Sequence, residues 1–104
     1  MTQLFDEKDP AEKWILEFDC SLDLAAGEAL TGTPTVTVTL ESGTDPTPNA
    51  TLNGAPTLGN SNKSIFQPVQ AGVHMCKYKF RASCATTNAN KLLVIAGILP
   101  VRTA

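Results

Sequence analysis

The sequence predicts an all-β protein, an immunoglobulin-like antiparallel β-sandwich of about seven short strands with one helical turn and a flexible N-terminal arm. The composition gives the first indication, with 13 threonines, 7 glycines and 7 prolines among 104 residues. β-Branched side chains suit a pleated surface, whereas glycine and proline mark turns. Short apolar runs alternate with polar residues between these turns. The length fits a single domain that buries its own core.

Residues 1–11 are polar and charged and end at an Asp-Pro turn signal. They are predicted to form a flexible arm that orders only on a partner, and residues 12–104 are predicted to form the sandwich domain. The residues of the arm that are expected to contact such a partner are Phe5, Asp6, Lys8 and Asp9.

The first predicted strand of the domain alternates, with apolar residues on one side and mostly charged residues on the other. Its inward residues are Trp14, Leu16, Phe18 and Cys20. The next stretch fits a single helical turn that begins at Ser21 as N-cap and stops at Gly27. We expect Leu22, together with Ala25 or Ala26, to cover one end of the sandwich.

The middle of the chain holds the clearest strand, in which Val36, Val38 and Leu40 alternate with threonines. Residues 41–62 are rich in turn formers, with Asn53-Gly54 as a hairpin signal. The following strand contains Pro68, which confines it to a sheet edge or places the proline at a strand end.

Two strands complete the prediction. The first points Cys76, Tyr78, Phe80 and Ala82 inward and forms a basic stripe on the other side, made of Lys77, Lys79 and Arg81. A turn over 85–90 leads to the last strand, residues 91–99. This strand shows little alternation, so it is expected to be buried on both sides or covered by a neighbour.

The net charge of −2 conceals a separation along the chain. Residues 1–50 carry ten acids and two bases, which gives −8, and residues 51–104 carry six bases and no acid, which gives +6. One interpretation is neutralisation between neighbouring strands of one molecule. The other is a homo-oligomer in which an acidic surface, Asp19, Asp23 and Glu28, meets the basic stripe of an identical neighbour head to tail.

Nothing in the sequence indicates an enzyme, a metal site or a cofactor. His74 is the single histidine, which leaves no Ser-His-Asp triad, and the carboxylates miss the spacing of a calcium loop. Cys20, Cys76 and Cys84 lack metal-ligand spacing and are expected to be small apolar residues. Tyr78 and Phe80 lie on the opposite strand face from the cations, which argues against nucleic acid.

Targeting signals and membrane spans are not predicted either. The N-terminus lacks the basic and apolar regions of a secretory signal. The longest apolar run, residues 92–101, is too short to cross a bilayer. The chain is therefore expected to be made in the cytoplasm and not to enter a membrane.

The order of these features resembles a family of small phage proteins, often labelled fiber-tail adaptor or minor virion structural proteins. Its members tend to open with "KDP", found here at 8–10, and pass through a "D-W-S-x-x-L-A-A-G-[DE]-T-I" motif, which "DCSLDLAAGEAL" matches at 19–30. A threonine–valine strand at 36–40, a Gly72 to Tyr78 stretch and a "TT" turn at 86–90 follow. Cys20 stands where the family often has tryptophan, and Ala29 and Leu30 replace threonine and isoleucine.

The resemblance implies a non-enzymatic structural protein of a tailed-bacteriophage virion, located in the virion and made in the bacterial host cytoplasm. Such a protein would hold portal, connector, tail, fibre or capsid proteins together as a homo-oligomer, through its arm, sheet edges and charged faces. Capsid decoration is one alternative. Another is a host-glycan-binding module that uses Trp14, Tyr78 and the asparagine-rich loop at 49–62, although no small-molecule ligand is expected.

Overall fold

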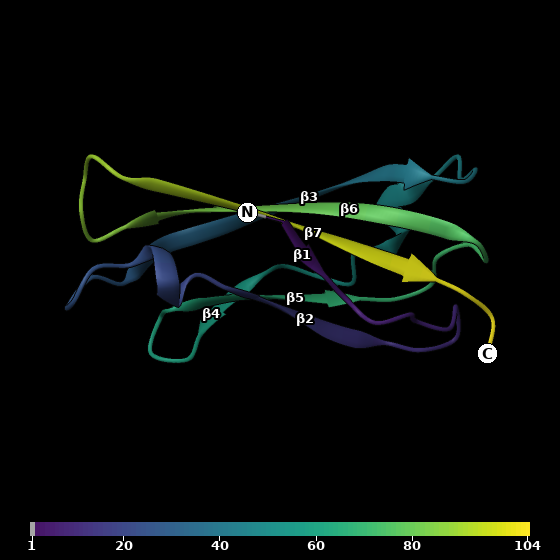
Figure 1. The fold of residues 1–104 in the computed structure, drawn as a ribbon, viewed down its shortest axis with the longest axis horizontal. Helices are drawn as coiled ribbons and strands as arrows, with labels where there is room; N and C mark the ends of the chain where they lie inside the picture. Colours follow the sequence, from purple (N-terminus) through teal and green to yellow (C-terminus); the bar gives the residue numbers. More distant parts are fainter. Residues whose placement is uncertain (1) are drawn as a thin grey trace.

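Two packed sheets make up the molecule, which confirms the all-β sandwich (Figure 1). The computed structural model describes residues 2–104. One sheet has four strands in the order β1 (Thr2–Leu4), β7 (Leu92–Val101), β6 (Cys76–Thr86) and β3 (Leu30–Ser42). The other has three, in the order β2 (Trp14–Asp19), β5 (Ser64–Val69) and β4 (Thr57–Gly59). The strands run along the longest dimension of a body of 42 × 21 × 20 Å.

The strands follow the alternation that the sequence predicts. On β3, Val36 and Val38 are buried while Thr35, Thr37 and Thr39 are exposed. β6 buries its even-numbered residues from Cys76 to Thr86. However, β3, β6 and β7 have 13, 11 and 10 residues, so the four-stranded sheet is built from longer strands than expected.

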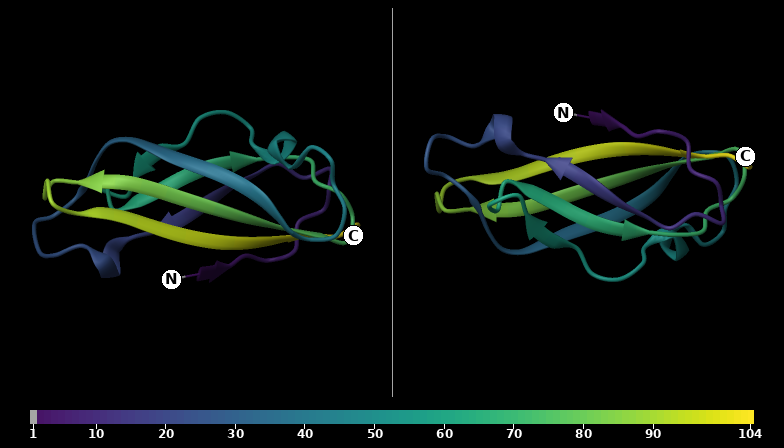
Figure 2. Two further views of the ribbon diagram at one scale, coloured as in Figure 1. Left: turned by 90° about the horizontal axis from the view of Figure 1, so that it is seen from above. Right: turned by 90° about the horizontal axis from the view of Figure 1, so that it is seen from below.

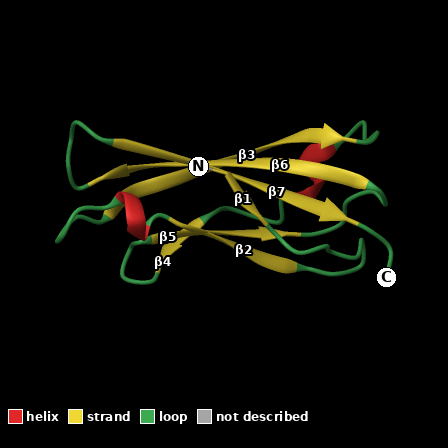
Figure 3. Ribbon diagram, viewed as in Figure 1, coloured by secondary structure: helices red, strands yellow, loops and turns green. Residues whose placement is uncertain are grey.

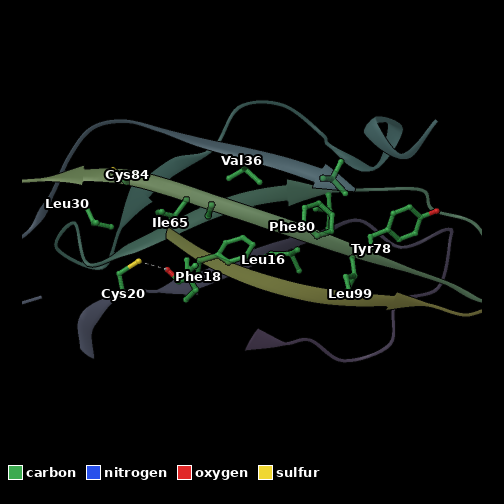
Figure 4. Packing of buried hydrophobic residues seen from close by; sticks show 14 of the residues in the cluster. Leu16, Phe18, Cys20, Leu30, Val36, Ile65, Tyr78, Phe80, Cys84 and Leu99 are labelled. Carbon is green, nitrogen blue, oxygen red and sulfur yellow. Dashed lines mark hydrogen bonds between the residues drawn. The ribbon is translucent and has the colours of Figure 1, made fainter. Parts of the chain in front are cut away.

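Apolar side chains from both sheets meet in one core (Figure 4). Phe18 from β2, Ile65 from β5 and Phe80 from β6 have no exposed surface. The three cysteines are free and buried, which confirms their prediction as core residues. The core thus runs between the sheets along the length of the molecule.

Short 3₁₀ turns lie toward opposite ends of the sandwich, η1 (Ser21–Asp23) after β2 and η2 (Pro48–Thr51) after β3 (Figure 3). The helical turn is where the sequence places it, but its details differ. The Asp19 carboxylate, not Ser21, supplies the side-chain acceptor, since its Oδ1 accepts the Ser21 N–H at 2.9 Å. Leu22 is 87% exposed, and Leu24 packs against the core instead.

The N-terminal segment is docked on the sandwich, which corrects the expectation of a flexible arm for residues 2–11; Met1 lies outside the described residues. β1 pairs in parallel with β7, with Thr2 opposite Ala96 and Leu4 opposite Ile98 (Figure 2). The Lys8 N–H continues this edge by donating to the Pro100 carbonyl at 3.0 Å. The segment thereby becomes an edge strand rather than an arm.

Two side chains explain why this segment is ordered. The Phe5 ring packs edge-on against Phe18, with centroids 5.5 Å apart and planes at 86°. Gly97 leaves the space for that ring, because a Cβ there would lie 2.4 Å from Phe5 Cε2. Lys8 is fully buried, and its Nζ donates to the carbonyls of Asp9, at 3.0 Å, and Ala71, at 2.7 Å.

Two strands have patterns that differ from simple alternation, β7 with its continuous apolar run and β5 with its proline. β7 is not buried on both sides: alternate residues face the core, while Leu92 and Val94 on its outer face are exposed. β5 is the central strand of its sheet, and Pro68 is its next-to-last residue, beyond the part that β4 pairs. The proline therefore lies near a strand end, where its missing N–H is tolerated.

Candidate interaction surface

The predicted basic stripe lies on the outer face of the four-stranded sheet. Lys77, Lys79 and Arg81 on β6 are exposed, while Tyr78 and Phe80 between them are fully buried. The register places Lys79 between Thr39 of β3 and Ile98 of β7. In the same way Arg81 lies between Thr37 and Ala96.

An apolar row lies beside this stripe on the outer face of β7. Leu92 and Val94 are 65% and 41% exposed, and Ala96, Ile98 and Pro100 are partly exposed. We refer to these five residues together with the three β6 cations as the cation–apolar face. Across the edge, Leu4 of β1 is opposite Ile98 and 79% exposed, so it extends the apolar row.

The strand residues of this face include no carboxylate. On β3, Thr39 and Thr37 lie opposite Lys79 and Arg81, whereas Lys77 lies opposite Ser42, next to the exposed Glu41. Among residues 2–104 there are two ion pairs, Glu28 with Lys91 and Glu7 with Arg102, and neither involves the β6 cations. Lys79 and Arg81 therefore have no carboxylate opposite them on the neighbouring strands, and none of the three cations forms an ion pair within residues 2–104.

The predicted acidic surface lies at the η1 end of the molecule and is largely engaged within the chain. Lys91 Nζ is 2.6 Å from Glu28 Oε1 and also donates to the Asp23 carbonyl. The hydrogen bond from Lys91, aided by the Ala25 N–H, lowers the pKa of Glu28. The Ser21 N–H lowers the pKa of Asp19 in the same manner. Asp23 is exposed.

The residues predicted as arm contacts are divided by the docking of β1. Lys8 is fully buried, and Phe5 is partly buried with its ring packed against the core, so neither side chain is a freely exposed contact. The Asp9 carboxylate accepts hydrogen bonds from the N–H groups of Ala104 and Ala11. Both hydrogen bonds lower the pKa of Asp9, and the one from Ala104 lowers it more. Asp6 is exposed.

The aromatic residues considered for glycan binding do not form an exposed platform. Tyr78 is fully buried, which corrects its assignment to a sugar site. Its hydroxyl donates to Asp45 Oδ2 at 2.6 Å and accepts the Val73 N–H at 2.8 Å, so it ties two loops together. Trp14 is partly buried against the core, and its indole N–H donates to Glu12.

One shallow pocket opens where the cation–apolar face ends, beside Lys77 and Pro100. It measures about 110 Å³, below the roughly 300 Å³ of typical ligand sites. Its lining includes Lys77, Pro100 and Glu7, the partner of Arg102. The pocket is a small extension of the face rather than a small-molecule site.

Other chemistry is sparse in the described part of the chain. Residues 2–104 hold no group of three or more histidine, cysteine or acidic side chains arranged to bind a metal ion. Burial raises the pKa of the Cys20 thiol to about 11, and burial also raises that of Cys84, which keeps both protonated and poorly nucleophilic. No helix in this part is long and apolar enough to span a membrane.

Comparisons with known proteins supply no relative: no family model, curated protein or solved structure matches the chain. The candidate surface therefore rests on the residues themselves. Sequence reasoning found the basic stripe but missed the apolar row beside it. The row could have been found by treating the two strands on either side of the turn near Thr87 as a hairpin. Pairing Cys84 with Leu93 in such a hairpin places Arg81 beside Ala96.

Proposed function

We propose that this protein is a non-enzymatic structural protein of a tailed-bacteriophage virion, an adaptor that holds other virion proteins together. The order of its sequence motifs supports the virion setting, since "KDP" and the 19–30 motif resemble those of fiber-tail adaptor proteins. The sandwich is compatible with such a role, and fold alone does not define function.

The cation–apolar face is the observation that carries the proposed binding role. It combines exposed leucine and valine side chains with three cations that have no carboxylate partner among residues 2–104. Exposed apolar side chains gathered on one face mark surfaces that bind other proteins. The adaptor therefore binds through a sheet face, while its docked N-terminal strand closes one sheet edge.

Particle composition tests this function directly. Particles of the phage whose genome encodes the chain are purified on a density gradient, and their proteins are quantified by mass spectrometry. We expect the chain in fixed stoichiometry to the major capsid protein, and we expect it to stay with the particle after a wash in moderate salt. Its absence from intact, infectious particles would refute the virion assignment.

A further inference from the structure

We propose that the cation–apolar face is the docking site for an acidic amphipathic helix of a different protein. The inference deepens the proposed function, because it names the binding surface and the chemistry of its partner.

The position of the face excludes strand addition as the way a partner binds it. Backbone donors and acceptors of β6 are used in pairing with β3 and β7, so an added strand finds no partners there. A sheet face is instead covered by a helix or by another sheet, through side chains alone. A partner that joins by strand addition would have to use a sheet edge.

The spacing of the cations fits a helix that lies along β6. Alternate residues of a strand are about 6.6 Å apart, so Lys77, Lys79 and Arg81 span about 13 Å. Carboxylates at every fourth position of an α-helix recur at about 6 Å, close to that spacing. The β7 row lies about 4.8 Å to the side, which requires an apolar stripe next to the acidic one.

A second copy of this chain is a poor occupant. A two-fold contact through the same face would set Lys79 and Arg81 against identical cations. A head-to-tail contact would need the acidic surface, but Glu28 is already paired with Lys91 and Asp19 already accepts the Ser21 N–H. Asp23 is therefore the one carboxylate of the acidic surface without such a contact, a poor match for three cations, and we assign the matching carboxylates to another protein.

A synthetic helical peptide serves as the probe, with about 18 residues, which span about 27 Å. It carries glutamates at every fourth position beside a stripe of leucines, and a fluorescent label reports binding by anisotropy. A scrambled peptide of the same composition disperses both stripes. The protein variants are Lys79→Glu/Arg81→Glu, the shape-conserving Val94→Thr, and Lys13→Glu as a matched control, since Lys13 is an exposed cation outside the face.

We expect the double charge reversal to weaken peptide binding by roughly tenfold or more, and Val94→Thr by about threefold. Lys13→Glu should change the affinity by less than about twofold, and the scrambled peptide should bind at least about tenfold more weakly. Circular dichroism verifies that each variant is folded. This combination would show that the face recognises both stripes together.

Several results would overturn the inference. They are no binding of the patterned peptide, equal binding of the scrambled one, or equal affinity for wild type and the double reversal. Binding to single-stranded DNA or to anionic vesicles that is tighter than binding to the peptide, and that is lost in Lys79→Glu/Arg81→Glu, would assign the face to another class of partner. A homo-oligomer that dissociates on Lys79→Glu/Arg81→Glu would assign it to a second copy. All these outcomes leave the presence of the chain in particles untouched, so the two proposals fail separately.

Discussion

Gly97→Ala should release the N-terminal strand from the sandwich. An alanine Cβ at this position would lie 2.4 Å from Phe5 Cε2 and 3.0 Å from Phe18 Cε1. Carbon atoms in contact prefer at least about 3.5 Å, so the Phe5 ring must move by about 1 Å or leave. Overpacking of this kind costs about 1–3 kcal/mol. Since Gly97 is not in the left-handed region, alanine should recover about 0.4–1 kcal/mol by restricting the unfolded chain.

The net expectation is a loss of about 1–2 kcal/mol in the free energy of unfolding, measured by urea denaturation. The same substitution in a Phe5→Ala background should cost much less, because only the 3.0 Å approach to Phe18 Cε1 remains. The two changes should thus show a coupling energy of about 1–2 kcal/mol. Trypsin cleavage after Lys8 gives a second measurement, since that site is buried in wild type and should become accessible in Gly97→Ala.

Additivity would contradict this reasoning. If Gly97→Ala costs the same with Phe5 present or absent, the ring is not what the new Cβ meets. Unchanged cleavage after Lys8 would show that the segment stays docked despite the substitution. Gly54→Ala is a useful comparison, since nothing lies within 4 Å of its Cβ position and its positive φ of 96° alone should produce the cost.

Three further predictions concern buried polar groups and charge. Tyr78→Phe removes the hydroxyl that joins Asp45 to Val73, so we expect a loss of about 1–2 kcal/mol in urea denaturation, and no loss would contradict the tie between the loops. Burial lowers the pKa of Lys8, so the unfolded chain holds its proton to higher pH than the folded one. Wild type should therefore gain stability relative to Lys8→Met as the pH rises toward the ordinary lysine value of 10.5, and a flat difference would count against a desolvated ammonium. Burial raises the pKa of Cys20 from 9.0 to about 11, so its contribution is complete below pH 9 and is lost as pH rises through 11; the alkaline decline in stability should be shallower in Cys20→Ala, and parallel pH profiles would refute this.

The interior of the sandwich could be predicted from the sequence, because apolar residues recur at every second position in a strand with one buried face. The valines of β3 and the alternation of β6 from Cys76 onward satisfy this rule over enough residues to fix both the strand and its facing. The same rule predicted that the three β6 cations would be exposed. Their interpretation as a site still required knowledge of the neighbouring strands.

Features that depend on residues far away in the sequence could not be predicted from local patterns. β1 has three residues and pairs with a strand more than 90 positions away, so its polar segment was expected to be a flexible arm. The continuous apolar run of β7 predicts a strand that is buried on both sides or covered by a neighbour, but nothing covers Leu92 and Val94 among the described residues. Leu22 and Leu24 are equally apolar, and only the path of the chain after η1 decides that Leu24 reaches the core.

The parallel pairing of β1 with β7 has a mechanical consequence. If a partner pulls on the N-terminal end of β1 while another pulls on the C-terminal end of β7, the two strands are loaded in opposite directions along their length. Their hydrogen bonds then resist in shear and share the tension, whereas a hairpin pulled from its open end separates one bond at a time. The packing of Phe5 against the core and the burial of Lys8 add resistance to sliding. The docked strand thus makes the sandwich suited to transmitting force between the start of β1 and the C-terminal end of β7.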